Sequence, residues 1–129
     1  VIVTRIATPW QKREGGSLLE NFFRGGRLYY SDEELGEILE LIEQKPSVVI
    51  ANLYRPSVLT EINEQCGALM ADFDTSDEVL TDVLFGKREA NGKLPFELPS
   101  SQEAVEKQME DLPYDSENPL YPFGFGLSF

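Results

Sequence analysis

The residues of this chain best suited to chemistry lie in one loop, residues 8–16. It contains a single acid, Glu14, two cations, Lys12 and Arg13, and Trp10, the only tryptophan of the sequence. Two glycines follow Glu14 and leave the backbone free to project its side chain. A carboxylic acid can transfer protons, and an aromatic ring can stack on an apolar ligand face. The plain alternatives are an ordinary exposed glutamate and a tryptophan that packs in the core or at an interface.

A cluster of aromatic and arginine residues follows in the same connection: Phe22, Phe23, Arg24, Arg27, Tyr29 and Tyr30. Such a composition is typical of protein interfaces. We expect these residues to contact another domain or chain. Direct contact with a ligand and plain core packing are the alternatives.

Several kinds of site are excluded by composition. The sequence has no histidine and one cysteine, Cys66. A Ser-His-Asp triad, a Cys-His pair and a histidine-based zinc site within the chain are therefore impossible, as is an intrachain disulfide. We expect Cys66 to be a small buried hydrophobic residue.

The net charge also limits the classes of partner that the chain could bind. The net charge of −12 argues against nucleic acid. Residues 1–30 carry five basic and two acidic residues, so the acidic excess lies in the rest of the chain. The longest apolar run, residues 48–51, is too short to cross a membrane. No signal peptide is visible, which slightly favours a cytoplasmic location.

The pattern of the first half predicts strands at residues 1–7, 47–53 and 67–73. Between the first two lies a helix that begins with a capping box of Ser31 and Glu34. Residues 10–30 keep no helical or strand period. A loop of this length is uncommon in a compact domain and is often functional.

The second half predicts short elements: a helix opening at Arg55, a helix capped by Thr75 with Glu78, a strand at residues 94–98, and a helix capped by Ser100 with Glu103. Strands that alternate with helices indicate a three-layer α/β/α sandwich with a largely parallel, mixed sheet. We expect residues 1–129 to form a single domain.

Three ordered motifs close the chain: DVLFG at residues 82–86, NGKLPF at 91–96 and PLYPFGFGLS at 119–128. Together they resemble the C-terminal α/β sandwich domain of glycoside hydrolase family 3, the family of β-glucosidases and related exo-acting enzymes. The likeness upstream is looser but continuous, so it covers essentially the whole chain.

The resemblance implies a catalytic apparatus that spans two domains. The preceding barrel domain, with its nucleophilic aspartate, is absent from this sequence, so the chain looks like a C-terminal piece that is inactive alone. Retaining glycosidases use two carboxyl groups about 5–5.5 Å apart. In many family members the second comes from a sandwich-domain loop that corresponds to residues 8–16 here. The family's chemistry implies no metal or organic cofactor.

By this resemblance, Glu14 becomes the candidate acid/base, with Glu20 as the next choice. Trp10 and Arg13 become candidates for binding the glycoside. The cluster with Phe22 and Phe23 would contact the barrel domain or a second chain. The expected interface residues are Phe22, Phe23, Arg24 and Arg27.

Two other interpretations remain open. The chain could be a non-catalytic interaction domain that docks on a partner or self-associates. It could also be a flavodoxin- or receiver-like module that uses Asp72 and Asp74 at a strand end. The latter rests only on analogy of fold.

Overall fold

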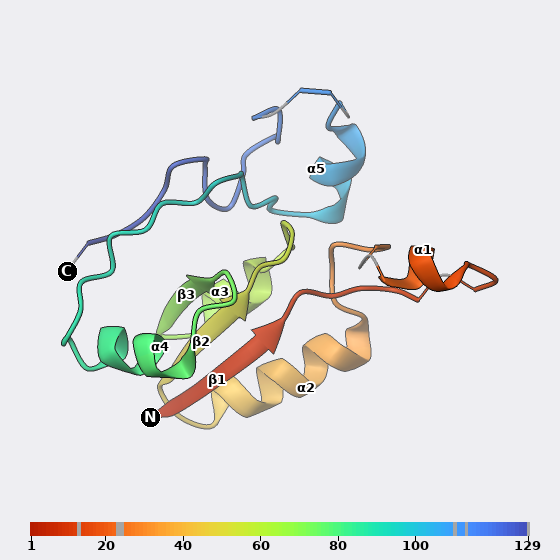
Figure 1. Ribbon diagram of the computed structural model, residues 1–129. Helices are drawn as coiled ribbons and strands as arrows, with labels where there is room; N and C mark the ends of the chain where they lie inside the picture. Colours follow the sequence, from red (N-terminus) through yellow and green to blue (C-terminus); the bar gives the residue numbers. More distant parts are fainter. Residues whose placement is uncertain (13, 23–24, 110, 113, 129) are drawn as a thin grey trace.

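The centre of the molecule is a sheet of three parallel strands, β1 (Ile2–Ala7), β2 (Ser47–Asn52) and β3 (Ala68–Asp72), in the order β1-β2-β3 (Figure 1). Each strand lies where the sequence predicts one, with its ends trimmed by at most one residue. The computed structural model describes residues 1–12, 14–22, 25–109, 111–112 and 114–128.

All three strands end at the same edge of the sheet. Ala7 is the register partner of Asn52, and Asn52 is the partner of Asp72. The connections that leave this edge therefore start side by side, although they are far apart in sequence. The carboxyl edge of a parallel sheet is the usual place for binding residues in α/β proteins.

One face of the sheet is covered by α2 (Asp32–Glu43) and α3 (Thr60–Gln65), which connect successive strands and contact each other. Consecutive right-handed crossovers place both helices on the same face. The strand residues that point to this face form the main core with them. The buried members of the main core are Ile6, Ile42, Val49, Ala51, Leu53, Leu59, Ile62, Leu94 and Leu98.

The opposite face is covered by α4 (Asp77–Leu84). Ile50 is buried there, and its register partner Arg5 donates from Nη1 to Asp77 Oδ1 at 2.9 Å. The buried residues of α4 are Leu80 and Val83. With helices on both faces, the fold is the three-layer α/β/α sandwich expected from the sequence. Within the described part of the chain, the named strands all run parallel.

Helix α2 begins with the predicted capping box. Ser31 Oγ accepts from the backbone N–H of Glu34 at 3.2 Å, and Glu34 Oε2 accepts from the backbone N–H of Ser31 at 2.8 Å. Both bonds serve N–H groups that the start of a helix leaves without intrahelical partners. Leu35, Ile38 and Leu39 then pack against the main core.

Helix α4 begins one residue later than the sequence predicts. Its cap is Ser76, whose side chain accepts from the backbone N–H of Val79 at 3.5 Å. Thr75 stands outside the helix because its own backbone N–H donates to Asp72 Oδ1 at 2.7 Å, and its carbonyl accepts from Arg5 at 3.1 Å. A contact with β3 therefore sets the start of this helix.

The last helix, α5 (Gln102–Lys107), shows the same shift. Its cap is Ser101, which accepts from the backbone N–H of Ala104 at 3.1 Å, rather than Ser100. The carbonyl of Ser100 accepts instead from Thr60 Oγ1 at 2.6 Å. This bond ties Ser100 to the start of α3.

The predicted strand at residues 94–98 is wrong as a continuous element. Leu94 and Leu98 each exchange a pair of backbone hydrogen bonds with the C-terminal segment. The partners are Gly124 and Phe125 for Leu94, and Leu120 and Tyr121 for Leu98. Pro95 has no N–H to continue a ladder between these two points.

Helix α3 also starts later than predicted, at Thr60 rather than at Arg55. The residues before it run across the carboxyl edge of the sheet, where the N–H of Val58 donates to the carbonyl of Leu28 at 2.8 Å. Cys66, which follows α3, is half-buried against the main core rather than fully buried.

Candidate functional site

The two ends of the connection between β1 and α2 pair with each other, and the residues between them extend away from the sheet. Gln11 and Gly25 form an antiparallel bridge, in which the N–H of Gln11 donates to the carbonyl of Gly25 at 2.9 Å. Gly26 adopts a φ of +83°, and a Cβ there would overlap the side chain of Gln11. We call the segment from Thr8 to Gln11 the outgoing leg and the segment from Gly25 to Tyr30 the returning leg. The two legs can approach so closely only because residue 26 is glycine. We call the described residues beyond this bridge, 12 and 14–22, the arm (Figure 1, red-orange).

The arm carries a short helix that the sequence analysis missed, α1 (Leu18–Phe22). Its apolar side chains are largely exposed: Leu18 by 95%, Leu19 by 73% and Phe22 by 82%. Five residues show too little of a helical period to reveal this element in the sequence. The arm therefore presents an apolar surface away from the main core.

The predicted ligand residues lie in and next to the arm. Glu14 is exposed within it. Trp10, at the foot of the outgoing leg, is 46% exposed and lines a hollow of about 310 Å³. The other residues lining the hollow are Ile6, Ala7, Thr8, Pro9, Tyr30, Glu34, Glu37 and Ile38. Glu14 is not among them, so the structure does not bring the two candidates into one pocket.

The remaining candidates differ in what the structure says of them. Arg13, Phe23 and Arg24 lie outside the described residues, as does the side chain of Glu20. Arg27 donates from Nη2 to Glu34 Oε2 at 2.6 Å and from Nε to the carbonyl of Tyr29 at 3.1 Å. Its guanidinium is therefore held within the chain, at the foot of the returning leg.

Tyr30 fastens the end of this connection to β1. Its hydroxyl donates to the carbonyl of Ala7 at 2.5 Å. Burial, reinforced by the nearby carboxylate of Glu34, raises the pKa of Tyr30, so its hydroxyl keeps its proton. The pKa of Glu34 itself is lowered, chiefly by the backbone N–H of Ser31.

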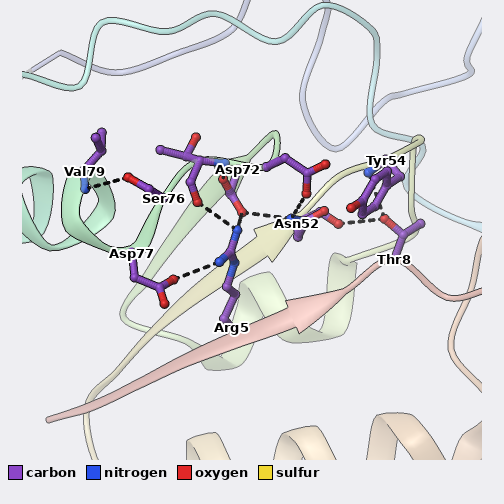
Figure 2. A network of polar contacts seen from close by, with 10 residues as sticks. Arg5, Thr8, Asn52, Tyr54, Asp72, Ser76, Asp77 and Val79 are labelled. Carbon is purple, nitrogen blue, oxygen red and sulfur yellow. Dashed lines mark hydrogen bonds and ion pairs between the residues drawn. The ribbon is translucent and has the colours of Figure 1, made fainter.

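A buried polar network lies at the sheet edge from which the arm departs (Figure 2). Asp72 is 1% exposed, and its Oδ2 accepts from Arg5 Nη2 and from Asn52 Nδ2, the latter at 3.1 Å. Burial alone would raise the pKa of Asp72. The backbone N–H of Thr75 and the guanidinium of Arg5 outweigh it and hold the pKa below its usual value.

The same network includes Thr8, in the segment that leads from β1 to the arm. Its hydroxyl donates to the backbone carbonyl of Asn52 at 2.7 Å and accepts from the backbone N–H of Tyr54 at 3.2 Å (Figure 2). Sequence reasoning missed Thr8, Asn52 and Tyr54 as members of one site. The polar residue at the end of each strand was the available signal, because parallel strands end side by side.

Asp72 is thus committed to structural contacts, which does not favour the receiver-like interpretation. Among the described residues, no group of three or more cysteine, aspartate and glutamate side chains could hold a metal ion. Over the same residues, no helix has the length and apolar character needed to cross a membrane.

Known proteins match the chain over nearly all of its length. It is 41% identical to a probable beta-glucosidase C of Aspergillus flavus over 125 residues, which is 97% of this chain and 19% of that protein. It is 38% identical to beta-glucosidase C of Emericella nidulans, again over 97% of the chain and 20% of that protein. A periplasmic beta-glucosidase/beta-xylosidase of Dickeya chrysanthemi is 37% identical over 98% of the chain and 20% of its own length.

The chain therefore spans about a fifth of these relatives, and the matched part includes most of the arm. The family model of the glycosyl hydrolase family 3 C-terminal domain matches residues 28–129, from the returning leg to the end of the chain. This range holds β2, β3 and the three closing motifs. The chain belongs to the glycosyl hydrolase family 3 C-terminal domain family.

Proposed function

We propose that residues 1–129 act as one domain that completes the active site of a β-glucosidase-like hydrolase. The rest of that active site lies on a barrel domain, which supplies the nucleophile. Together the two domains hydrolyse O-glycosidic bonds, whereas this chain alone is inactive. The names of the relatives, beta-glucosidases and a beta-glucosidase/beta-xylosidase, support this class of substrate.

The observation that carries the proposal is the exposed apolar surface of the arm. A helix of five residues is not stable in water by itself. Helix α1 nevertheless presents Leu18 and Phe22 largely to solvent. Such a surface is suited to pack against a second domain, which would bring Glu14 to the domain boundary. Phe23 and Arg24, next along the chain, would extend the same interface.

The chemistry assigned to the arm is that of the second carboxyl group. Glu14 first protonates the leaving oxygen while the aspartate of the barrel attacks the sugar carbon. It then takes a proton from the water that releases the sugar. Trp10 stacks on the apolar face of a sugar ring, and Arg13 binds its hydroxyl groups. No metal or organic cofactor takes part in this scheme.

Hydrolysis of an aryl β-glucoside tests the proposal. The isolated chain should show no turnover, and addition of a barrel domain from a relative should restore it. In that complex, Glu14→Gln should lower kcat/KM by about 10²–10⁴-fold, as expected for loss of an acid/base. Glu61→Gln, at an exposed position of α3, is the matched control and should retain the activity. An unchanged rate for Glu14→Gln would remove Glu14 from this role.

A second candidate function is a non-catalytic interaction domain. The exposure of Leu18 and Phe22 favours it equally, because the same surface could join two copies or a partner. Analytical ultracentrifugation separates the two functions. Self-association that Phe22→Ser abolishes, without any turnover on adding a barrel domain, would favour the interaction domain.

A further inference from the structure

The two segments that lead into and out of the arm are both held by residues 52–58, which run from the last residue of β2 toward α3 and which we call the clasp. On the outgoing leg, the buried hydroxyl of Thr8 bridges two backbone groups of the clasp. It donates to the carbonyl of Asn52 at 2.7 Å and accepts from the N–H of Tyr54 at 3.2 Å (Figure 2). Trp10 follows only two residues later.

On the returning leg, the clasp uses an arginine side chain. Arg55 Nη2 donates to the carbonyls of Gly26 and Arg27 at 2.6 and 2.5 Å. The backbone N–H of Val58 donates to the carbonyl of Leu28 at 2.8 Å. The contacts of Arg55 lie directly after the bridge between Gln11 and Gly25, so they hold the base of the arm.

The clasp itself is fixed to the sheet. Asn52 Nδ2 donates to Asp72 Oδ2 and to Asp74 Oδ1, both at 3.1 Å. Ser57, near its other end, and Leu59, which directly follows it, are fully buried. These contacts therefore tie the base of the arm to the carboxyl edge of the sheet.

We infer that Thr8 and Arg55 are positioning residues, which orient Trp10 and Glu14 through the clasp. Neither residue is assigned a contact with substrate. The catalytic meaning of this inference rests on the proposed function, since a catalytic group must be held close to its productive geometry. The mechanical claim concerns the isolated chain and can be tested there.

The test is collisional quenching of the single tryptophan by iodide, measured on the isolated chain. Trp10 is 46% exposed, so release of the outgoing leg in Thr8→Val should raise its quenching constant roughly twofold as local opening exposes the ring. Thr8→Ser keeps the hydroxyl and should behave as the unchanged protein does.

Thr60→Val is the matched control. It removes a hydroxyl that also donates to a backbone carbonyl, that of Ser100 at 2.6 Å, which belongs to the connection before α5 and not to the arm. It should lower the melting temperature without changing the quenching of Trp10. Equal quenching changes in Thr8→Val and Thr60→Val would overturn the inference, because they would report general loosening of the fold.

Arg55→Met tests the returning leg separately, with Arg88→Met, which breaks an exposed ion pair to Asp82, as its control. Arg55→Met should raise the quenching constant and Arg88→Met should not. Each reading is taken where far-UV circular dichroism reports a folded chain. If neither Thr8→Val nor Arg55→Met changes the quenching, the clasp does not position the arm, whatever the outcome of the turnover experiment.

Discussion

Asn52 and Asp72 are register partners at the ends of β2 and β3, and the side-chain amide of Asn52 donates to the carboxylate of Asp72 at 3.1 Å. The pair connects two sets of contacts at the carboxyl edge of the sheet. On one side, Asp72 holds Arg5 and the start of α4; on the other, the backbone of Asn52 holds Thr8 at the foot of the arm.

The buried carboxylate should make stability depend on pH. The pKa of Asp72 in the folded chain lies below its ordinary value of 3.8, so ionised Asp72 stabilises the fold above that pH. This contribution is lost as the pH falls through the folded-state pKa. Asp72→Asn should therefore cost about 1–3 kcal/mol at neutral pH, because the amide keeps only one of the two acceptor oxygens and loses the charge that pairs with Arg5. The deficit should shrink below pH 3.8 in urea unfolding of both proteins; parallel pH profiles would contradict this.

Substitution of a buried and of an exposed leucine should have very different effects on stability. Leu59 is fully buried in the main core, so Leu59→Ala should lower the free energy of unfolding by about 2–5 kcal/mol. Leu18 is 95% exposed, and Leu18→Ala should change it by less than about 0.5 kcal/mol. Denaturant titrations followed by circular dichroism give both values. A large cost for Leu18→Ala would show that the arm packs on the core in solution.

The capping box of α2 should contribute measurably to stability. Ser31→Ala removes the acceptor for the N–H of Glu34 and should cost about 1 kcal/mol in the free energy of unfolding. Ser31→Asn keeps a side-chain acceptor and should cost only a few tenths of that. Equal losses in these two variants, measured by urea titration, would count against a capping role.

Alanine at two glycines should have opposite effects. Gly36 lies inside α2 with open space around the added Cβ, so Gly36→Ala should stabilise the chain by about 0.5–1 kcal/mol. At Gly126 the added Cβ would overlap the carbonyl oxygen of Gly92, so Gly126→Ala should shift the C-terminal segment and lower the melting temperature. Scanning calorimetry of both variants checks the two signs, and a stabilising Gly126→Ala would rule out the close approach.

Local signals in the sequence were read correctly where no distant residue interfered. The box of Ser31 and Glu34 involves only neighbouring residues, and the strands follow from short runs rich in β-branched and apolar residues. The caps predicted at Thr75 and Ser100 failed because Arg5 and Thr60, which lie 70 and 40 residues away in the sequence, donate to the carbonyls of these two residues and hold them outside their helices. Propensity cannot anticipate such tertiary contacts.

The candidate site was also predicted only in part. Composition pointed to the loop with Trp10 and Glu14, because lone aromatic and acidic residues beside glycines are visible without a structure. The clasp was not predicted, since Arg55 and Thr8 act through backbone carbonyls, and any side chain with a donor could in principle reach one. The hydrogen bonds of the folded chain show that these two residues hold the same arm.

The bridge between Gln11 and Gly25 has an evolutionary consequence. Because both legs are secured below it, residues beyond the bridge can be exchanged, lengthened or shortened while the contacts of the three layers stay intact. Loops closed at their ends tolerate insertions at little thermodynamic cost. Substitutions in the arm can thus change its preference for a partner or ligand while the rest of the domain keeps its structure.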